Sequence, residues 1–483
     1  MALATLTTGR VLDGFTVGEM VHRGGMAMLW RVTKPGVSFP LLMKVPVLFE
    51  GEDPAAIVGF EMEQMILPRL SGPHVPKFVA AGDFSVQPYI VMEQIEGETL
   101  LALLTKLPLP YEQVADIGQR VAVALQDIHR QHVVHLDVKP SNIILRASGE
   151  AALLDFGLSR HDQLPDLMDE EFRLPYGTAP YMAPEQVMGI RNDPRSDIFA
   201  LGAMMYFFST GVRPFGDPHR LKGLKRRCWR DPVPPRKLRK DFPPWLQEVI
   251  LKCMEVNPAW RYPNAAQLAF DLANPGQVKL TVRSERVRQD SFMTALKRRL
   301  NPETHCAQRN RDQLAKHLDM APIIAVALDL DAGEDLSEAL RTTVKRVLDT
   351  VPGARLACIN VLKESRLMSD TTLDDEGHSK HVRRLVQLKG WAQPLNLDEG
   401  RLSFHVLAAT NPAAAILEYA RANHVDHIVL GARANSTMRT LLGSVSAEVA
   451  GHAPCTVTVV RPPRSGADAE TPAAMAREPV VAE

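Results

Sequence analysis

Cysteine, long apolar runs and any excess of one charge are all scarce in this 483-residue sequence. None of its five cysteines forms a C-x-x-C pair, which argues against a disulfide scaffold or a zinc ribbon and favours a reducing compartment. No run reaches the roughly 18 apolar residues of a membrane span, and the N-terminus lacks the build of a signal peptide. The 56 basic residues balance the 56 acidic ones. We therefore expect a cytoplasmic protein that binds neither nucleic acid nor membrane.

The composition changes along the chain, and these changes predict its boundaries. Residues 10–273 alternate strand-like and helix-like stretches, whereas residues 274–320 carry ten Lys and Arg against five Asp and Glu, as a solvated basic linker would. Residues 321–462 again alternate apolar strands with helices. Residues 463–483 are rich in Pro, Ala and charge, which predicts a disordered tail.

Three features near the N-terminus suggest a phosphate site. Gly24 and Gly25 split a strand–turn–strand pattern, and glycines there let backbone amides approach a phosphate. Lys44 lies inside the apolar run "PLLMKVPVL", where an ammonium group is costly to bury without a carboxylate or a phosphate. The helical spacing of "FEMEQMILPRL" places Glu63 where it can face Lys44. Each feature has a plainer alternative, since a hairpin can carry two glycines and an edge-strand lysine can reach water.

The stretch "HLDVKPSNIIL" (135–145) carries side chains suited to phosphoryl transfer. Asp137 can accept a proton from an incoming hydroxyl, and Lys139 can neutralise charge on the moving phosphoryl group. Asn142 can hold a metal ion together with Asp155 of "LLDFGLSR". Phosphoryl transfer needs positioning and charge neutralisation more than covalent help, and these groups supply both.

In this order, the motifs resemble the eukaryotic-like serine/threonine protein kinases of bacteria over residues 10–273. The ordered set also includes "DFG" (155–157), "APE" (183–185), "RSDIFALG" (195–202) and "NPAWR" (257–261). The resemblance implies an α+β fold of two lobes, the N-terminal lobe extending to about residue 95 and the C-terminal lobe spanning 96–273. It also implies transfer of the γ-phosphate of Mg-ATP, or of ATP with Mn²⁺, to protein Ser and Thr hydroxyls, autophosphorylation included.

The resemblance further implies a role for each matching residue. Lys44 would hold the α- and β-phosphates and pair with Glu63, and the backbones of Glu93 and Ile95 would meet adenine. The implied ATP-binding residues are Val21, Gly24, Gly25, Leu29, Lys44, Glu63, Glu93 and Ile95. Those implied for catalysis are Asp137 as the base, Lys139 and Thr178, and those for Mg²⁺ are Asn142 and Asp155. Glu185 and Arg261 would form a structural ion pair.

Two features depart from the family pattern. His22 and Ala27 replace the first and third glycines of the phosphate loop. Leu136 stands where most members have an arginine that pairs with a phosphorylated residue of the activation loop. Between Ser159 and Thr178 that loop contains "HDQLPDLMDEEF", which is acidic and has no hydroxyl. We therefore predict that activation-loop phosphorylation does not gate the enzyme.

The alternative interpretation is a catalytically weak pseudokinase that acts as a nucleotide-responsive scaffold. Loss of a functional group at Lys44, Asp137 or Asp155 would support it, and all three are present. The sequence therefore favours catalysis.

The second ordered region reads as a doubly wound parallel sheet, which binds ligands beyond the carboxyl ends of its strands. The strand-like "PIIAVALDL" ends near Asp329, and an amphipathic helix follows it. Asn411 and Pro412 are suited to the N-cap and first position of another helix.

Residues 321–462 resemble the universal stress protein family, most clearly in "GARANSTMRTLLGSVSAEVAGHAPCTVTVV" (431–460). Gly431, Gly443 and Ser444 match the family's nucleotide motif, and the resemblance adds Asp329 as an adenine or ribose contact. Ala434 replaces its second glycine and the following gap is one residue short, so a domain without nucleotide remains an equal alternative. The resemblance also implies a homodimer through residues 455–460. This domain is thus expected to sense nucleotide or to drive dimerisation.

Overall fold

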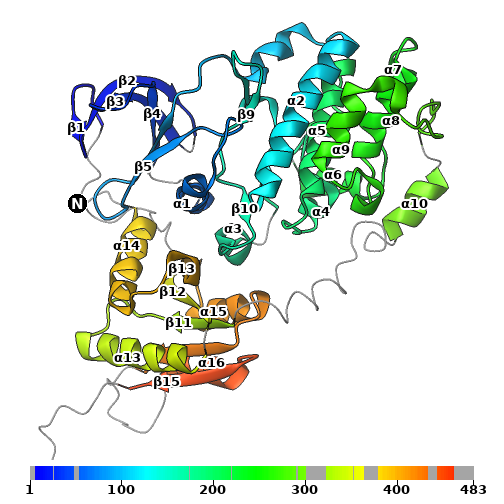
Figure 1. Ribbon diagram of the computed structural model, residues 1–483. Coiled ribbons are helices and arrows are strands. Elements are labelled where there is room, and N and C mark those ends of the chain that lie inside the picture. Colours follow the sequence, from blue (N-terminus) through cyan, green and yellow to red (C-terminus); the bar gives the residue numbers. More distant parts are fainter. Residues whose placement is uncertain are drawn as a thin grey trace, which may run out of the picture.

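The computed structural model describes residues 6–25, 27–47, 54–172, 175–218, 220–289, 292–300, 322–351, 353–363, 379–432 and 443–461. They form a two-lobed N-terminal region and a separate C-terminal α/β domain (Figure 1). The predicted tail and residues 301–320 of the predicted linker lie outside the described residues. Within the described ranges, none of the helices combines the length and apolarity needed to cross a membrane.

An antiparallel six-stranded sheet of order β1-β2-β3-β4-β6-β5 forms the N-terminal lobe. Its strands are β1 (Val11–Leu12), β2 (Phe15–Arg23), β3 (Ala27–Thr33), β4 (Leu41–Pro46), β5 (Phe78–Gly82) and β6 (Tyr89–Glu93). Alternate residues such as Phe15, Val17 and Met43 fill the core on one side because successive strand side chains point to opposite faces. The lobe's long helix, α1 (Pro54–Ile66), packs against β4.

The C-terminal lobe is mostly helical. Helix α2 (Tyr111–Arg130) packs on α5 (Arg195–Thr210) and α9 (Ala265–Ala273), and α5 packs on α8 (Pro244–Cys253). Buried residues recur along α2 at helical spacing, from Val114 to Ile128. Its short helices are α3 (Leu167–Glu171), α4 (Pro184–Val187), α6 (Leu221–Leu224) and α7 (Pro235–Leu238). The strand pairs β7 (Val133–Val134) with β10 (Arg160–His161), and β8 (Ile143–Leu145) with β9 (Ala151–Leu153), hold the loops that carry the predicted chemistry.

The first part of the predicted linker packs on this lobe rather than lying in solvent. The Gln247 side-chain amide donates to the carbonyls of Arg283, Ser284 and Arg286, and Arg283 pairs with Glu248 at 2.9 Å. Helix α10 (Phe292–Leu300) follows. The difference arises because these basic residues have buried acidic partners that lie far away in the sequence.

The C-terminal domain is a parallel sheet of order β13-β12-β11-β14-β15. Its strands are β11 (Ile323–Ala327), β12 (Arg355–Lys363), β13 (Leu402–Ala409), β14 (His427–Gly431) and β15 (Thr456–Val460). Alternate residues of β11 enter two separate cores. Helices α13 (Glu334–Thr350) and α14 (Lys380–Ala392) cover one face, and α15 (Pro412–Ala422) and α16 (Ser444–His452) cover the other.

These arrangements confirm both predicted fold classes, the two-lobed α+β fold and the doubly wound α/β domain. The predicted helix cap is confirmed as well, since the Asn411 side chain accepts from the backbone amides of Ala413 and Ala414. The C-terminal domain lies next to both lobes, with α3 against β13 and α15 (Figure 1).

Candidate functional site

Lys44 joins the two lobes. Its ammonium nitrogen lies 2.5 Å from Glu63 Oε2 of α1 and 2.9 Å from Asp155 Oδ1, which follows β9. Burial disfavours the charged amine, but the nearby carboxylates outweigh this effect and raise the pKa of Lys44. The same ammonium group lowers the pKa of Asp155 to about 2, against the opposing effect of burial. Burial raises the pKa of Glu63, although Lys44 opposes this.

The Asp137 carboxylate has polar partners on both of its oxygens. Oδ1 accepts from the backbone amide of Thr178 at 3.0 Å and from its hydroxyl at 2.7 Å. Oδ2 lies 2.6 Å from Lys139 Nζ and 3.2 Å from Asn142 Nδ2. The structure thus brings Asp137, Lys139, Asn142 and Thr178 together, and it shows that this carboxylate can accept a hydrogen bond from an aliphatic hydroxyl.

Asn142 and Asp155 lie on adjacent segments, because the amide of Leu154 donates to the Asn142 carbonyl at 2.9 Å. An ionised carboxylate and a side-chain amide oxygen suit a hard divalent cation such as Mg²⁺. Among the described residues, no group of three or more His, Cys, Asp or Glu side chains could hold a metal. A Mg²⁺ ion at Asn142 and Asp155 would need further oxygen ligands because its coordination is octahedral, and phosphate groups carry such oxygens.

The residues predicted to contact nucleotide lie along the N-terminal lobe. Val21 is on β2 and Leu29 is on β3, and the two strands are joined by the turn that holds Gly24 and Gly25. The Gly24 amide donates to the Ala27 carbonyl at 2.9 Å, which closes the turn.

Glu93 ends β6, and Ile95 follows it in a small buried cluster. The carboxylate of Glu93 points to Arg146, with Oε1 2.7 Å from Nη1. A hydrogen bond from Arg146 lowers the pKa of Glu93. Its side chain is therefore occupied, and its backbone amide is occupied as well, because it donates to the Lys77 carbonyl at 2.9 Å.

Asp197 is a fully buried residue of α5 that holds the loop carrying Asp137. The sequence analysis assigned it no role. Its Oδ2 accepts from the amide of His135 at 2.9 Å and its Oδ1 from the amide of Leu136 at 2.8 Å, while His129 Nε2 lies 2.8 Å from Oδ2. The motif "RSDIFALG" was visible, but a single sequence does not show which backbone atoms its carboxylate meets.

Leu136 is compatible with this loop. It is buried, it adopts a left-handed φ of 63°, and its carbonyl accepts from Gln186 Nε2 at 2.8 Å. The loop conformation therefore depends on backbone hydrogen bonds, and the apolar side chain does not disturb the position of Asp137.

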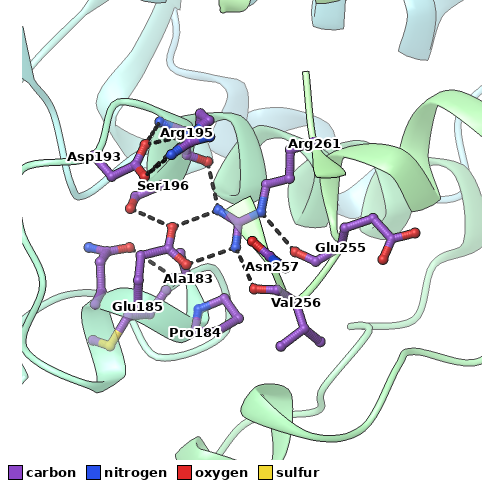
Figure 2. Close-up of polar contacts among 12 residues, drawn as sticks. Ala183, Pro184, Glu185, Asp193, Arg195, Ser196, Glu255, Val256, Asn257 and Arg261 are labelled. Atoms are coloured by element: carbon purple, nitrogen blue, oxygen red, sulfur yellow. Dashed lines mark hydrogen bonds and ion pairs between the residues drawn. The ribbon is translucent and has the colours of Figure 1, made fainter. Parts of the chain in front are cut away.

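A second buried ion pair, formed by Glu185 and Arg261, lies in the C-terminal lobe. Arg261 donates to both oxygens of Glu185, at 2.6 and 2.7 Å, and both side chains are almost fully buried (Figure 2). The remaining guanidinium protons go to the carbonyls of Arg195, Glu255 and Val256. This pair connects α4 with the segment before α9, and so holds the C-terminal end of the loop that contains Thr178.

The predicted second nucleotide site is only partly described, because residues 433–442 lie outside the described residues. Asp329 follows β11, Gly431 ends β14, and Gly443 and Ser444 begin α16. A Cβ on Gly431 would lie 2.8 Å from a Leu336 methyl group of α13. Close packing against α13 is therefore sufficient to explain that glycine.

Comparison with known proteins matches both regions to families. Residues 52–270 match the protein kinase domain, and residues 320–461 match the universal stress protein family. A probable serine/threonine-protein kinase of Clostridium perfringens, CPE1738, is 29% identical over 266 residues, which cover 55% of this chain and 38% of that protein. The serine/threonine-protein kinase PknB of Mycolicibacterium smegmatis is 30% identical over 273 residues, which cover 55% of this chain and 43% of that protein. The chain thus spans less than half the length of these relatives.

Among solved structures, the PknI kinase domain of Mycobacterium tuberculosis is similar to this chain. The two are 24% identical with a TM-score of 0.45, and the match covers 56% of this chain and 99% of that one.

Proposed function

The chain carries a protein kinase domain followed by a universal stress protein domain, and on this premise we propose that it transfers the γ-phosphate of Mg-ATP to Ser and Thr hydroxyls of proteins, its own included. The observation that carries the proposal is the assembled set of charged groups. Lys44 is paired with both Glu63 and Asp155 while Asp137 receives a hydroxyl hydrogen bond beside Lys139.

In the proposed reaction, Asp137 accepts the proton of the attacking hydroxyl, and the hydroxyl oxygen bonds to the γ-phosphorus as the bond to the leaving ADP oxygen breaks. Lys139 stabilises charge on the transferred group, and Lys44 holds the other phosphates. Asn142 and Asp155 would hold Mg²⁺, which neutralises phosphate charge when it is bound. The protein side chains therefore promote the reaction by positioning the reactants and by stabilising charge on them.

The universal stress protein domain is proposed to sense nucleotide or to form a dimer. Dimerisation is supported by the place of β15 at the edge of the sheet, where among the described strands it pairs with β14 alone. An exposed edge strand is a template for pairing with a second copy. Sedimentation equilibrium of the full chain measures this property directly.

Replacing Lys44 with methionine is expected to lower phosphoryl transfer on the order of 10²-fold, because the phosphates lose a positioned charge and two carboxylates lose their partner. Incorporation of label from γ-labelled ATP into the chain and into a protein acceptor measures the effect. Lys106→Met is the matched control, since Lys106 is exposed at the end of a short 3-10 helix (Leu100–Lys106) of the C-terminal lobe. If the wild type incorporates no label, the scaffold interpretation replaces the enzyme.

A further inference from the structure

The acidic, hydroxyl-free part of the activation loop contacts the universal stress protein domain through α3. Glu170 Oε1 lies 2.8 Å from Arg355 Nη2 of β12, and its Oε2 lies 2.9 Å from His405 Nε2 of β13 and 3.0 Å from the Tyr419 hydroxyl of α15. Asn423 donates to the Glu170 carbonyl at 3.3 Å. One glutamate side chain thus meets three elements of the other domain.

The next residue extends the contact. Glu171 Oε1 lies 3.1 Å from His405 Nδ1, so the imidazole ring lies between two carboxylates. The His405 side chain is 0% exposed and that of Glu170 is 10% exposed. Burying charged groups is costly unless they are paired, so an incidental contact would not bury them. Leu167 and Met168, on the apolar side of α3, belong to the same buried cluster as Val406 of β13.

A second contact reaches α1. Lys389 Nζ of α14 lies 2.6 Å from Glu61 Oε1, and 4.8 Å from the centre of the Phe84 ring. Glu61 belongs to the same helix as Glu63, which pairs with Lys44. Helix α3 also packs on α1. The universal stress protein domain therefore touches α1 both directly and through α3.

Helix α1 is in turn fixed to the metal-binding segment. A Cβ on Gly157 would lie 3.0 Å from the Gly59 carbonyl oxygen, and one on Gly59 would lie 3.2 Å from the Gly157 carbonyl oxygen. The two backbones are in direct contact, so a shift of α1 would move the segment that carries Asp155. The serine and threonine hydroxyls of the loop are also occupied, since Ser159 donates to the His135 carbonyl at 3.0 Å and Thr178 donates to Asp137.

From these contacts we infer that the universal stress protein domain is an activating partner in cis: it binds the acidic helix α3 through Arg355, His405 and Tyr419, and so holds α1 where Glu63 pairs with Lys44. In the family pattern, an arginine at position 136 binds an added phosphate. Here a permanent carboxylate, Glu170, is bound by cations of another domain, and position 136 is apolar. The inference rests on the proposed kinase function.

The groups around His405 predict that this contact weakens as pH rises. The charged or titratable groups at the two contacts between the domains are Glu170, Glu171, Tyr419, Arg355, Glu61 and Lys389. Burial opposes a charged imidazole, but both glutamates outweigh it and raise the pKa of His405 to about 9. Burial also raises the pKa of Glu171 to about 7, whereas His405 and Arg355 outweigh burial and lower that of Glu170 to about 2.

These pKa shifts determine how the stability of the contact changes with pH. A raised histidine pKa stabilises the contact fully below about pH 6.5, and this contribution is lost as pH rises through about 9. Ionisation of Glu171 removes further stability between its ordinary pKa and about 7. We expect the amide protection of α3, corrected for intrinsic exchange rates, to be higher at pH 6 than at pH 9.5, and His405→Gln to flatten the difference. Protection that rises with pH would contradict the assignment.

The test uses the full chain and two readouts, the rate of label transfer from γ-labelled ATP and hydrogen exchange of α3. Arg355→Glu and Lys389→Glu place like charges at the two contacts without touching the phosphoryl-transfer residues. Each is expected to speed exchange in α3 and to lower the transfer rate on the order of tenfold. Lys345→Glu, an equal charge change on the exposed side of α13, is expected to match the wild type in both readouts.

The exchanged pair Glu61→Lys with Lys389→Glu is expected to recover most of the rate lost in Lys389→Glu alone, which misfolding would not allow. Faster exchange of α3 without a lower rate would overturn the activating role, and unchanged exchange would overturn the docking itself. A wild type that transfers no label would overturn the proposed kinase function and the activating role together, while exchange of α3 would still measure the docking.

Discussion

The chain with Asp137→Asn is expected to transfer phosphate about 10³-fold more slowly than the wild type, within the range that general base catalysis contributes. Asparagine has nearly the same shape, so the backbone of the loop, held by Asp197, is expected to persist. Its amide has one acceptor oxygen in place of two. It can replace the acceptor that faces Thr178 or the one that faces Lys139, but not both, and it cannot take up a proton from the attacking hydroxyl.

Initial rates of label transfer at saturating ATP measure this loss. Binding of ATP is expected to change little, because Lys44 and Asp155 are untouched, so the effect should fall on kcat rather than on KM. Asp116→Asn is the matched control, since Asp116 is an exposed residue of α2 that pairs with Arg120. A kcat within a few-fold of the wild type would rule out Asp137 as the base.

Arg261→Ala is expected to destabilise the kinase domain by about 3–5 kcal/mol, the usual cost of leaving a buried charge without its partner. The substitution leaves the Glu185 carboxylate buried with Ser196 as its remaining side-chain partner, and it removes one donor from each of three backbone carbonyls. The midpoint of thermal unfolding is expected to fall by roughly 10 °C for a domain of this size.

The double variant Glu185→Leu with Arg261→Met distinguishes the effect of an unpaired buried charge on stability from the effect of lost packing. This double variant has no unpaired charge, so it is expected to lose less stability than Arg261→Ala alone. Circular dichroism of the full chain during heating measures both midpoints, and Arg346→Ala on the exposed side of α13 serves as the control. An unchanged midpoint for Arg261→Ala would show that the pair does not hold the lobe together.

The sequence predicted the parts of this molecule whose signals are local. The periodicity of the apolar residues after Asp329 predicted α13, and Asn411 with Pro412 predicted the start of α15. The chemistry of phosphoryl transfer restricts residue types at fixed spacing, which is why Asp137, Lys139 and Asn142 could be singled out and why the structure finds them in contact.

The contacts that could not be predicted join residues that lie far apart in the chain. Glu170 and Arg355 are 185 positions apart, and each alone reads as an ordinary surface charge. The packing of residues 283–286 on Gln247 was missed for the same reason, because a basic stretch resembles a solvated one until its acidic partners are located. Sheet order and the place of Asp197 under the loop are likewise properties of the folded chain.

The Glu170–Arg355 pair makes docking of the two domains independent of the protein concentration. Both residues belong to one polypeptide, so they meet at a local concentration set by chain geometry, on the order of millimolar for tethered modules. Diluting the protein, or expressing it at a few copies per cell, would leave the fraction of docked molecules unchanged. A cut between the two domains would make that fraction depend on how much of each piece is present.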